Sequence, residues 1–268
     1  METGKANNIQ AKSFNTDLYE KYHLSVQIGL THFSYCIINI DTTNVEYFKE
    51  FFVNDNILDI IKEEEILKLN FSSSRVALTN LPYTLIPNEL TVKEGSKEIL
   101  ELTTEVYESI ESDELTSIDA TLFYTIPNNI NDLLFTFFPN ADKKAQQSIL
   151  IEQFSRFENK KENAYLYISE KVLNITIFRR GKLIFNNSFS FETKEDILYF
   201  TLFSFEQLKI DTESVEAKLY GNIIKEDENY QLLYDYIRNI GFGSRLKNLK
   251  FSSIFNDFKD YQFYALFS

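Results

Sequence analysis

The sequence predicts an α/β protein (α+β in its local arrangement) that is built from two similar units in tandem. Each half opens with three apolar runs typical of β-strands, changes to a helical period, and then adds a short fourth strand. The spacing repeats as well, because Leu24 and Arg75 are 51 residues apart while Tyr165 and Ala217 are 52 residues apart. A chain of 268 residues is long enough for two lobes with a core each.

In the first half, the expected strands cover residues 24–30, 33–40, 45–52 and 75–79. Before the fourth strand, apolar residues recur at helical spacing among charged residues, which predicts an amphipathic helix. The apolar residues are Ile57, Ile60, Ile61, Leu67 and Leu69. The fourth strand is expected to end at the proline-punctuated stretch LPYTLIP. Residues 1–15 are expected to be a flexible tail.

In the second half, the expected strands cover residues 164–169, 172–178, 183–191 and 217–220. The sequence RRGK predicts a hairpin turn, in which Gly181 tolerates a positive φ. The third strand alternates, with one face formed by Leu183, Phe185, Phe189 and Phe191. Thr193 followed by Asp196 predicts a capping box that opens a helix to about Leu208.

A ribonuclease-H-like unit consists of three antiparallel strands, a crossover helix and a parallel fourth strand. Two such units in tandem indicate an internal duplication. We expect a first lobe at 16–140, with a small insertion at 88–140, and a second lobe at 141–268. Between the two units, strands are expected at 99–106 and 118–126 and helices at 129–138 and 141–157. A last helix is expected at 228–240, with Gly241 as its C-terminal cap.

Charge and cysteine usage limit the class of partner. The formal net charge is −13, and such a field repels phosphate backbones and anionic headgroups, which disfavours nucleic acid and membrane surfaces. The basic residues Arg179, Arg180 and Lys182 are better explained as a hairpin tip. Cys36 is the lone cysteine, which is typical of a reducing compartment, and no run of 18 apolar residues predicts a membrane span. We therefore expect a cytoplasmic protein.

Two passages carry a resemblance to a known family. They are LSVQIGLTHFSYCIIN and AYLYISEKVLNITIFRRGKLIFNNSFSF, the latter followed by a helix and AKLYGNI. The second passage resembles the later lobe of actin-like ATPases, especially the PilM branch of pilus assembly and the FtsA branch of cell division. The chain beyond its tail resembles a bacterial family of uncharacterised proteins, a domain-of-unknown-function family with an actin-like ATPase fold.

The resemblance implies a site for ATP and a divalent metal between two lobes, with Asp-x-Gly in the first hairpin. Here the matching residues are Gln27, Ile28 and Gly29, so the glycine is kept and the carboxylate is replaced by an amide. A neutral amide is a poor magnesium ligand and cannot orient an attacking water as a carboxylate does.

The other two motifs of the family also differ here. Where the second hairpin should again read Asp-x-Gly, this sequence has Tyr167, Ser169 and Glu170, and the paired glycines of the adenosine loop are reduced to Gly221 followed by Asn222. Because three of three motifs are altered, we expect no ATP hydrolysis by the usual machinery, no catalytic residue and no cofactor. If nucleotide binding is retained, Gln27, Gly29, Ser169 and Gly221 would line the site.

Other candidate sites have simpler explanations. His23 and His32 lack a second ligand cluster and are interpreted as surface or turn residues. Cys36, in the middle of a strand, is interpreted as a buried structural thiol. The segment from Gly241 to Gly243 follows a predicted helix, so a helix cap is favoured over a phosphate loop. An acidic run lacks the glycine and ligand spacing of a calcium loop and is interpreted as a solvated loop, and it comprises Glu105, Glu108, Glu111, Asp113 and Glu114.

The sequence therefore favours a non-catalytic adaptor or scaffold that binds an unidentified protein partner. The first alternative is a nucleotide-binding sensor or ATPase with altered phosphate-binding residues. The second is an actin-like filament or another homo-oligomer. No metal site, nucleic acid or membrane insertion is expected.

Overall fold

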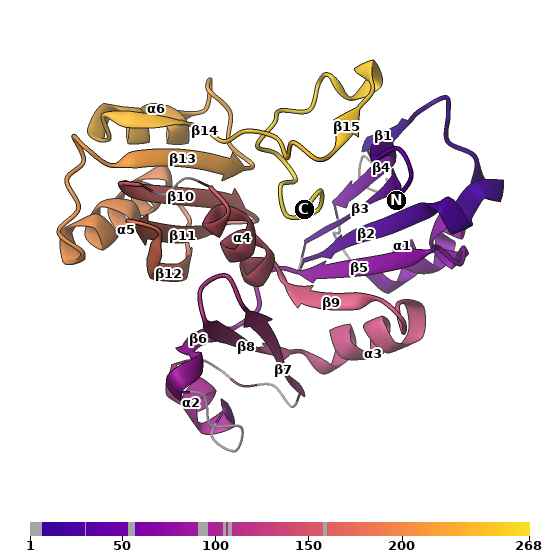
Figure 1. The fold of residues 1–268 in the computed structure, drawn as a ribbon, viewed down its shortest axis with the longest axis horizontal. Helices are drawn as coiled ribbons and strands as arrows, with labels where there is room; N and C mark the ends of the chain where they lie inside the picture. Colours follow the sequence, from indigo (N-terminus) through magenta and orange to yellow (C-terminus); the bar gives the residue numbers. More distant parts are fainter. Residues whose placement is uncertain are drawn as a thin grey trace. The chain divides into compact units, whose positions relative to one another are not determined.

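A computed structural model describes residues 7–29, 31–52, 57–90, 96–103, 106, 109–157 and 160–268 (Figure 1). The chain separates into two compact units. The first comprises Met1–Ile149, Leu246–Phe258 and Ala265–Ser268, and the second comprises Leu150–Arg245 and Lys259–Tyr264. This division differs from the expected lobes at 16–140 and 141–268, because the chain after Arg245 returns to the first unit, enters the second again and ends in the first.

The first unit contains a seven-stranded sheet in the order β1-β4-β3-β2-β5-β9, with β15 paired to β4. Its strands are β1 (Asn7–Gln10), β2 (Tyr22–Ile28), β3 (His32–Asn39), β4 (Asn44–Phe52), β5 (Ser73–Leu78), β9 (Asp142–Ala145) and β15 (Lys250–Phe251). Strands β2, β3 and β4 are antiparallel neighbours, and β5 lies parallel to β2. Helix α1 (Ile57–Glu63) and a 3-10 turn at Glu65–Lys68 lead from β4 to β5.

A smaller three-stranded sheet follows in the order β6-β8-β7, and its strands are β6 (Tyr83–Pro87), β7 (Ser109–Leu115) and β8 (Ala120–Ile126). Helix α2 (Ser96–Thr103) packs on it through Leu100, which joins Ile86 and Phe123 in a small core. Helix α3 (Asn128–Phe137) then leads to β9.

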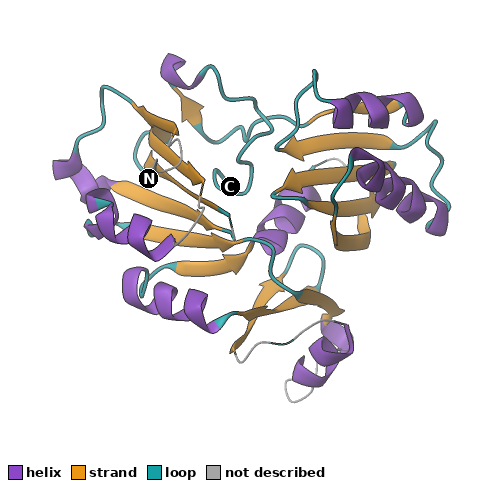
Figure 2. Ribbon diagram, turned by 180° about the vertical axis from the view of Figure 1, so that it is seen from behind, coloured by secondary structure: helices purple, strands orange, loops and turns teal. Residues whose placement is uncertain are grey.

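The second unit contains a five-stranded sheet in the order β12-β11-β10-β13-β14, as labelled in Figure 1. Figure 2 shows the molecule from behind, with strands in orange and helices in purple. Its strands are β10 (Glu162–Ser169), β11 (Val172–Arg179), β12 (Lys182–Ser190), β13 (Glu216–Gly221) and β14 (Asn239–Phe242). Helix α4 (Gln146–Ser155) precedes the sheet, and helices α5 (Lys194–Gln207) and α6 (Glu228–Tyr236) contribute to its core. The predicted order of three antiparallel strands, a helix and a parallel strand is confirmed in both units.

Apolar alternation explains which face of the second sheet packs on helices α5 and α6. Leu166 on β10, Ile175 on β11 and Leu219 on β13 are fully buried in one cluster. Ile197 and Phe205 of α5 complete it from the helix side. The other face of the sheet carries Tyr165 of β10.

Two local predictions for this unit are confirmed. Thr193 accepts a hydrogen bond from the N–H of Asp196, whose carboxylate accepts one from the N–H of Thr193, so the capping box is complete. Arg180 and Gly181 form the turn between β11 and β12 with φ values of 51° and 80°. Both values match a two-residue hairpin turn.

Several segment predictions are wrong. The predicted strand at 99–106 overlaps helix α2, in which Leu100 is buried and Leu102 is exposed, although two such residues would share a face in a strand. The fourth strand does end before the stretch LPYTLIP, but this stretch contains strand β6, which was not predicted. The predicted helix at 141–157 begins with strand β9, which pairs with β5.

The predicted helix at 228–240 ends at Tyr236, and Gly241 lies in strand β14 opposite Lys218 instead of capping a helix. The helix predicted over Ile57 to Leu69 is divided between α1 and the 3-10 turn. These errors lie where a short strand pairs with a distant one, which local periodicity does not reveal.

A β-bulge changes the predicted alternation of β12. Phe185 pairs with Ile177, but Leu183 pairs with Phe178, so Ile184 is the extra residue. A bulge shifts the side-chain alternation by one residue. Leu183 therefore lies on the face of Phe178, opposite the face that carries Phe185.

Part of the predicted tail is structured. Strand β1 pairs antiparallel with β4, with Asn7 opposite Glu50, and Ala11 is buried. In the described part of the chain, no helix has the length and apolar character needed to cross a membrane.

Candidate functional site

The first pair of predicted site residues lies at the carboxyl end of β2. Gln27 pairs with Ser34 on β3 and with Ala77 on the parallel strand β5. The N–H of Gly29 donates to the carbonyl of His32 at 2.8 Å and thereby closes the β2–β3 hairpin. This N–H is therefore used within the chain, whereas phosphate binding would need it to be available.

Gln27 belongs to a row of buried polar side chains. The register places Gln27, Ser34 and Glu50 side by side on β2, β3 and β4, and their exposed fractions are 3%, 0% and 6%. Neither Gln27 Oε1 nor Ser34 Oγ has a hydrogen-bond partner among the described residues. Burial raises the pKa of Glu50, and a hydrogen bond from Asn7 counteracts this in part. The row carries one carboxyl group, and the pKa of that group lies above its usual value.

His32 lies beside this row, and the prediction of a surface or turn position is wrong. Its ring is 6% exposed, and its Nδ1 atom lies 3.5 Å from Glu50 Oε1. Burial lowers the pKa of His32 to about 4, so the ring is neutral at pH 7. His23 lies elsewhere on β2, with Nδ1 at 2.8 Å from the hydroxyl of Ser73. The two histidines do not form a common site.

A small pocket lies next to Gly29, where β2 and β5 end. Its volume is ≈ 70 Å³, and its lining comprises Ile28, Gly29, the segment Leu78 to Pro82, Pro127 and Ile130. Pockets that hold drug-sized ligands measure about 300–1,000 Å³. The lining is mostly apolar and carries no charged side chain, so this pocket is unsuited to a nucleotide.

In the second unit, Ser169 closes a tight hairpin. Ser169 pairs with Val172, so only Glu170 and Lys171 form the turn, with φ values of 49° and 63°. Two consecutive left-handed residues are the mark of a type I′ turn. The side chain of Lys171 forms an exposed ion pair with Glu192 at 2.5 Å. A turn of two residues leaves no glycine-rich loop that could wrap a phosphate.

Gly221 ends β13 and is held by backbone contacts. Its φ is +84°, and a Cβ atom at this position would lie 2.1 Å from the carbonyl oxygen of Ile168. Its N–H donates to the carbonyl of Tyr261 at 2.9 Å, and the N–H of Asn222 donates to that of Ile168 at 2.7 Å. The close approach of β13 to β10 therefore explains why this position carries glycine.

Tyr167, which the resemblance to actin-like ATPases aligns with an Asp, lies in a layer of aromatic rings. Tyr167 pairs with Tyr220 in the parallel ladder. On the same face, the rings of Tyr165 and Phe154 stack with centroids 4.4 Å apart, and Tyr264 lies 4.7 Å from Tyr220. Burial raises the pKa of Tyr165, Tyr220 and Tyr264. This layer is an apolar packing surface with buried hydroxyl groups.

Gly243 makes room for the same layer. A Cβ atom on Gly243 would lie 2.1 Å from the ring of Tyr220, and its N–H donates to the carbonyl of Leu219 at 2.9 Å. The segment from Gly241 to Gly243 is therefore strand β14 and its continuation. The interpretation of this segment as a helix cap is wrong, and its glycines serve strand pairing and ring packing.

The acidic run has a structural role in strand β7. Glu105 and Glu108 lie outside the described residues, but Glu111, Asp113 and Glu114 lie in strand β7, so the solvated-loop interpretation is wrong there. Asp113 is buried and accepts a hydrogen bond from the N–H of Ala145 at 2.9 Å. In the part of the chain that the structure describes, no three His, Cys, Asp or Glu residues are grouped as a metal site would require.

The C-terminal segment covers the polar face of the first sheet, which sequence reasoning missed. Ser25 Oγ donates to the carbonyl of Leu266 at 2.6 Å, and Cys36 Sγ lies 3.8 Å from the same oxygen. Burial raises the pKa of Cys36, so its thiol is protonated and unreactive. No local pattern in the sequence indicates which strand this segment reaches.

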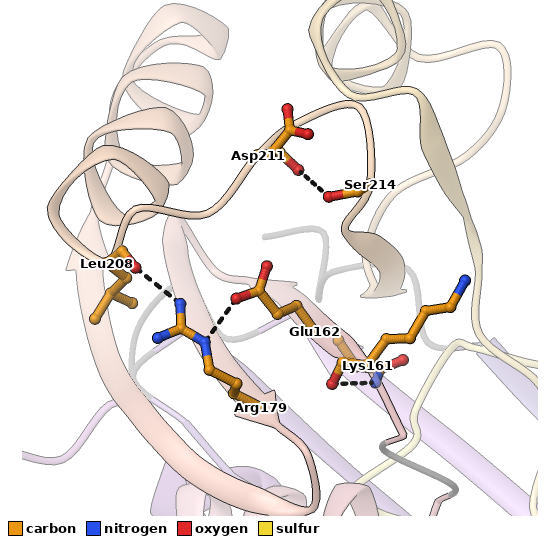
Figure 3. A network of polar contacts seen from close by, with 7 residues as sticks. Lys161, Glu162, Arg179, Leu208, Asp211 and Ser214 are labelled. Carbon is orange, nitrogen blue, oxygen red and sulfur yellow. Dashed lines mark hydrogen bonds and ion pairs between the residues drawn. The ribbon is translucent and has the colours of Figure 1, made fainter.

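A basic residue of the predicted hairpin tip also has a structural role. Arg179 donates from Nε to Glu162 at 2.6 Å and from Nη2 to the carbonyl of Leu208 at 2.8 Å (Figure 3). Leu208 is the C-cap of α5, so the guanidinium group satisfies a free carbonyl and complements the helix dipole. Arg179 thus joins β10, β11 and α5 and does not belong to a nucleic-acid patch.

The structure brings the predicted site residues together in pairs. Gln27 and Gly29 lie at the end of β2, and Ser169 and Gly221 lie beside each other because Ile168 pairs with Gly221. Within each unit, both residues lie where the parallel strands end. At each glycine, the backbone N–H that a phosphate would need is bonded to a carbonyl of the same chain.

Comparison with known proteins gives the family. The family described as "Protein of unknown function (DUF3822)" matches residues 11–240. The chain belongs to this family. No curated protein matches it.

Two solved structures show the fold. A Bacteroides thetaiotaomicron VPI-5482 protein with an actin-like ATPase fold and unknown function matches with a TM-score of 0.76 and 21% identity, covering 86% of this chain and 93% of that one. The PilM-PilN type IV pilus biogenesis complex matches with a TM-score of 0.58 and 10% identity, covering 86% and 90%. The chain therefore has the mixed α/β, actin-like ATPase fold that the sequence predicted.

Proposed function

We propose that this protein is a non-catalytic adaptor or scaffold that uses an actin-like fold to bind another protein. The observation that carries the proposal is the hydrogen bond from Gly221 N–H to the carbonyl of Tyr261 at 2.9 Å. The resemblance to actin-like ATPases implies that this region would face a nucleotide, and here the chain itself occupies the donor. The N–H of Gly29 is occupied in the same way by His32.

The chemistry of the side chains supports the same proposal. Hydrolysis of ATP needs groups that hold a divalent metal and orient a water, and carboxylates perform both tasks. Gln27 offers an amide and Tyr167 a phenol at the two positions where the resemblance to actin-like ATPases implies an Asp. Fold retention without this chemistry leaves binding as the function, since a fold alone does not specify an activity.

A protein partner is supported by the pilus biogenesis neighbour, which is a complex of PilM with PilN. We place the adaptor in the cytoplasm, in line with its lone buried thiol. The net charge of −13 disfavours nucleic acid as the partner.

The test is a thermal-shift titration with ATP and ADP, each with and without magnesium, followed by calorimetry. A ligand that binds only the folded state stabilises it by about 2.7 kcal/mol at one hundred times its dissociation constant. We expect no change in Tm with any nucleotide. A saturable, magnesium-dependent rise in Tm would overturn the proposal.

The alternative is a nucleotide sensor with altered contacts, and the retention of Gly29 and Gly221 is the observation that favours it. In that case the Tm shift should disappear in a Gln27→Ala, Ser169→Ala double variant. It should persist in Ser190→Ala, a matched change at an exposed serine of β12. A change of Gly221 is unsuitable here, because any side chain would collide with Ile168.

A further inference from the structure

Helix α5 carries apolar side chains on two opposite faces. Its inner face is buried in the core of the second unit through Ile197 and Phe205. On its outer face, Tyr199 is 60% exposed and Phe203 is 43% exposed. A surface helix of a globular protein normally presents polar residues to solvent, and a helix that is apolar all round is normally a buried one. Exposed rings on the outer face are therefore typical of an interaction surface.

The two exposed rings are held in place from behind. Tyr199 and Phe203 lie one turn apart, with ring centroids 5.7 Å apart and planes inclined by 19°. Tyr199 also meets the ring of Phe200 at 5.4 Å, and Phe200 stacks on Phe189 of β12 at 4.6 Å. Rings that are already ordered lose little conformational freedom on binding, which suits them as anchors at an interface.

Carboxylates frame the two rings along the helix. Glu195 lies four residues before Tyr199, and Glu206 lies three residues after Phe203. Residues three or four apart share a helix face, so these four residues form one stripe, the α5 stripe. Both glutamates are exposed. They are 11 positions apart, which corresponds to about 16 Å along the helix.

Basic residues near the helix do not neutralise the stripe. Lys194 is bound to Glu228 of α6 at 2.7 Å. The next basic residue along the chain, Lys209, follows the C-cap of the helix. Glu206 forms no ion pair with any residue that the structure describes. The stripe therefore presents two aromatic rings with a carboxylate at each end.

We propose that the α5 stripe docks a basic amphipathic helix of a partner protein. Apolar side chains of that helix pack on Tyr199 and Phe203, and a Lys or Arg of that helix lies at each of Glu195 and Glu206. An Arg guanidinium can also stack on an exposed tyrosine ring. This inference rests on the proposed adaptor function and adds where the partner binds and which charge it carries.

Charge complementarity selects a basic partner over a second copy of this chain. Two copies of α5 in antiparallel contact would place Glu195 against Glu206 of the partner subunit, and a parallel contact would place each carboxylate against its equivalent. Both arrangements bring like charges together, which disfavours association. The same carboxylates repel the anionic headgroups of a membrane surface.

The test uses a fluorescent, alanine-based helical peptide as the probe. It carries two arginines, spaced as Glu195 and Glu206 are, with leucines between them on the same face. A control peptide has glutamates in place of the arginines. Fluorescence anisotropy with the full chain should show saturable binding of the arginine peptide that weakens as salt is added. The glutamate peptide should bind about tenfold more weakly or not at all.

Matched variants locate the binding site. Phe203→Ala should weaken binding of the arginine peptide about tenfold, whereas Phe135→Ala, at an exposed phenylalanine of α3, should leave it unchanged. Glu206→Lys should weaken it to a similar extent, about tenfold. Glu213→Lys gives the same net charge at another exposed glutamate and should have little effect. Circular dichroism and Tm of each variant check that the fold is intact.

Three results would overturn this proposal. The first is no binding of the arginine peptide. The second is an equal loss in Glu206→Lys and Glu213→Lys, since the attraction would then come from net charge alone. The third is self-association in sedimentation that Phe203→Ala abolishes, because a second copy would then cover the stripe. A nucleotide-dependent rise in Tm would instead overturn the adaptor proposal and leave peptide binding intact, so the two proposals fail separately.

Discussion

The four-strand core of the first sheet, β4-β3-β2-β5, and that of the second, β12-β11-β10-β13, share strand order and pairing sense, but their surroundings differ. In the first sheet, the face with Ser25 and Cys36 is covered by the backbone of the C-terminal segment. In the second sheet, the corresponding face is covered by the ring of Phe154 and its aromatic neighbours. The comparison teaches that one strand order can be completed by polar backbone contacts or by apolar ring packing.

The edges of the two cores differ as well. The outer strand of the first core, β4, is paired on its far side with β1 and β15, whereas that of the second, β12, is the end strand of its sheet among the described residues. The two units therefore share a strand order, and they differ in the elements that are added around it. The following predictions test this comparison.

The largest effect is expected from removing the ring that covers the second sheet. Phe154→Ala should cost about 4 kcal/mol of unfolding free energy, because a fully buried ring is replaced by a cavity. Denaturant unfolding followed by circular dichroism measures this loss. Phe157→Ala is the control, since Phe157 is half-buried and contacts the same ring of Tyr165 at 5.8 Å. An equal loss in both variants would contradict a dominant role for Phe154.

The close approach of β13 to β10 gives the next prediction. Gly221→Ala should cost about 3 kcal/mol, because the positive φ and the contact with Ile168 are both unfavourable for a side chain. Gly181→Ala shares the positive φ but has no atom within 4 Å of its new Cβ, so about 1 kcal/mol is expected. Comparing the two denaturation midpoints separates the steric cost from the backbone cost. Equal losses would mean that β10 moves away from Gly221.

These two glycines also show what the sequence could and could not predict. Gly181 lies in the RRGK turn, where local turn chemistry is sufficient to predict a positive φ. Gly221 was predicted as a site residue by resemblance, but its hydrogen bond to Tyr261 joins residues 40 positions apart. Local patterns carry no information on such a contact. The sequence therefore indicated that Gly221 is a special position, but it did not predict that the Gly221 N–H is bonded to Tyr261.

The same limit applies to the fold. The strand order of both units follows from short-range alternation and was predicted. The bulge at Ile184 was not, because it is visible only in the pairing of Leu183 with Phe178. The C-terminal segment was assigned to the second lobe, although residues Ala265–Ser268 belong to the first unit. Its position depends on the carbonyl of Leu266 meeting Ser25, which lies 241 residues away.

A pH-dependent prediction concerns the polar row of the first sheet. Burial lowers the pKa of His32 from 6.5 to about 4, so the unfolded chain binds more protons than the folded one between these values. This contribution to stability is present above pH 6.5 and is lost as the pH falls to about 4, with a magnitude on the order of 3 kcal/mol. Glu50 acts in the opposite direction, because its raised pKa favours the folded state as the pH falls.

The His32→Gln variant isolates the histidine from Glu50. Unfolding free energies of the wild type and the variant, measured by urea denaturation across this pH range, should converge in acid. The wild type should lose stability more steeply on acidification. Parallel curves would show that His32 titrates as an exposed histidine and that the row is open to water.

The smallest expected effect compares two buried serines on neighbouring strands of the first sheet. Ser25→Ala removes the donor to Leu266 and leaves a buried carbonyl with only the weak thiol of Cys36, which should cost about 1–2 kcal/mol. Ser34→Ala removes a hydroxyl that has no hydrogen-bond partner among the described residues, so its effect should be close to zero or stabilising. Both serines are at most 1% exposed, so burial does not distinguish them. If Ser34→Ala destabilises as much as Ser25→Ala, then water or another group bonds to Ser34, and the polar row is better solvated than the part of the same face that the C-terminal segment covers.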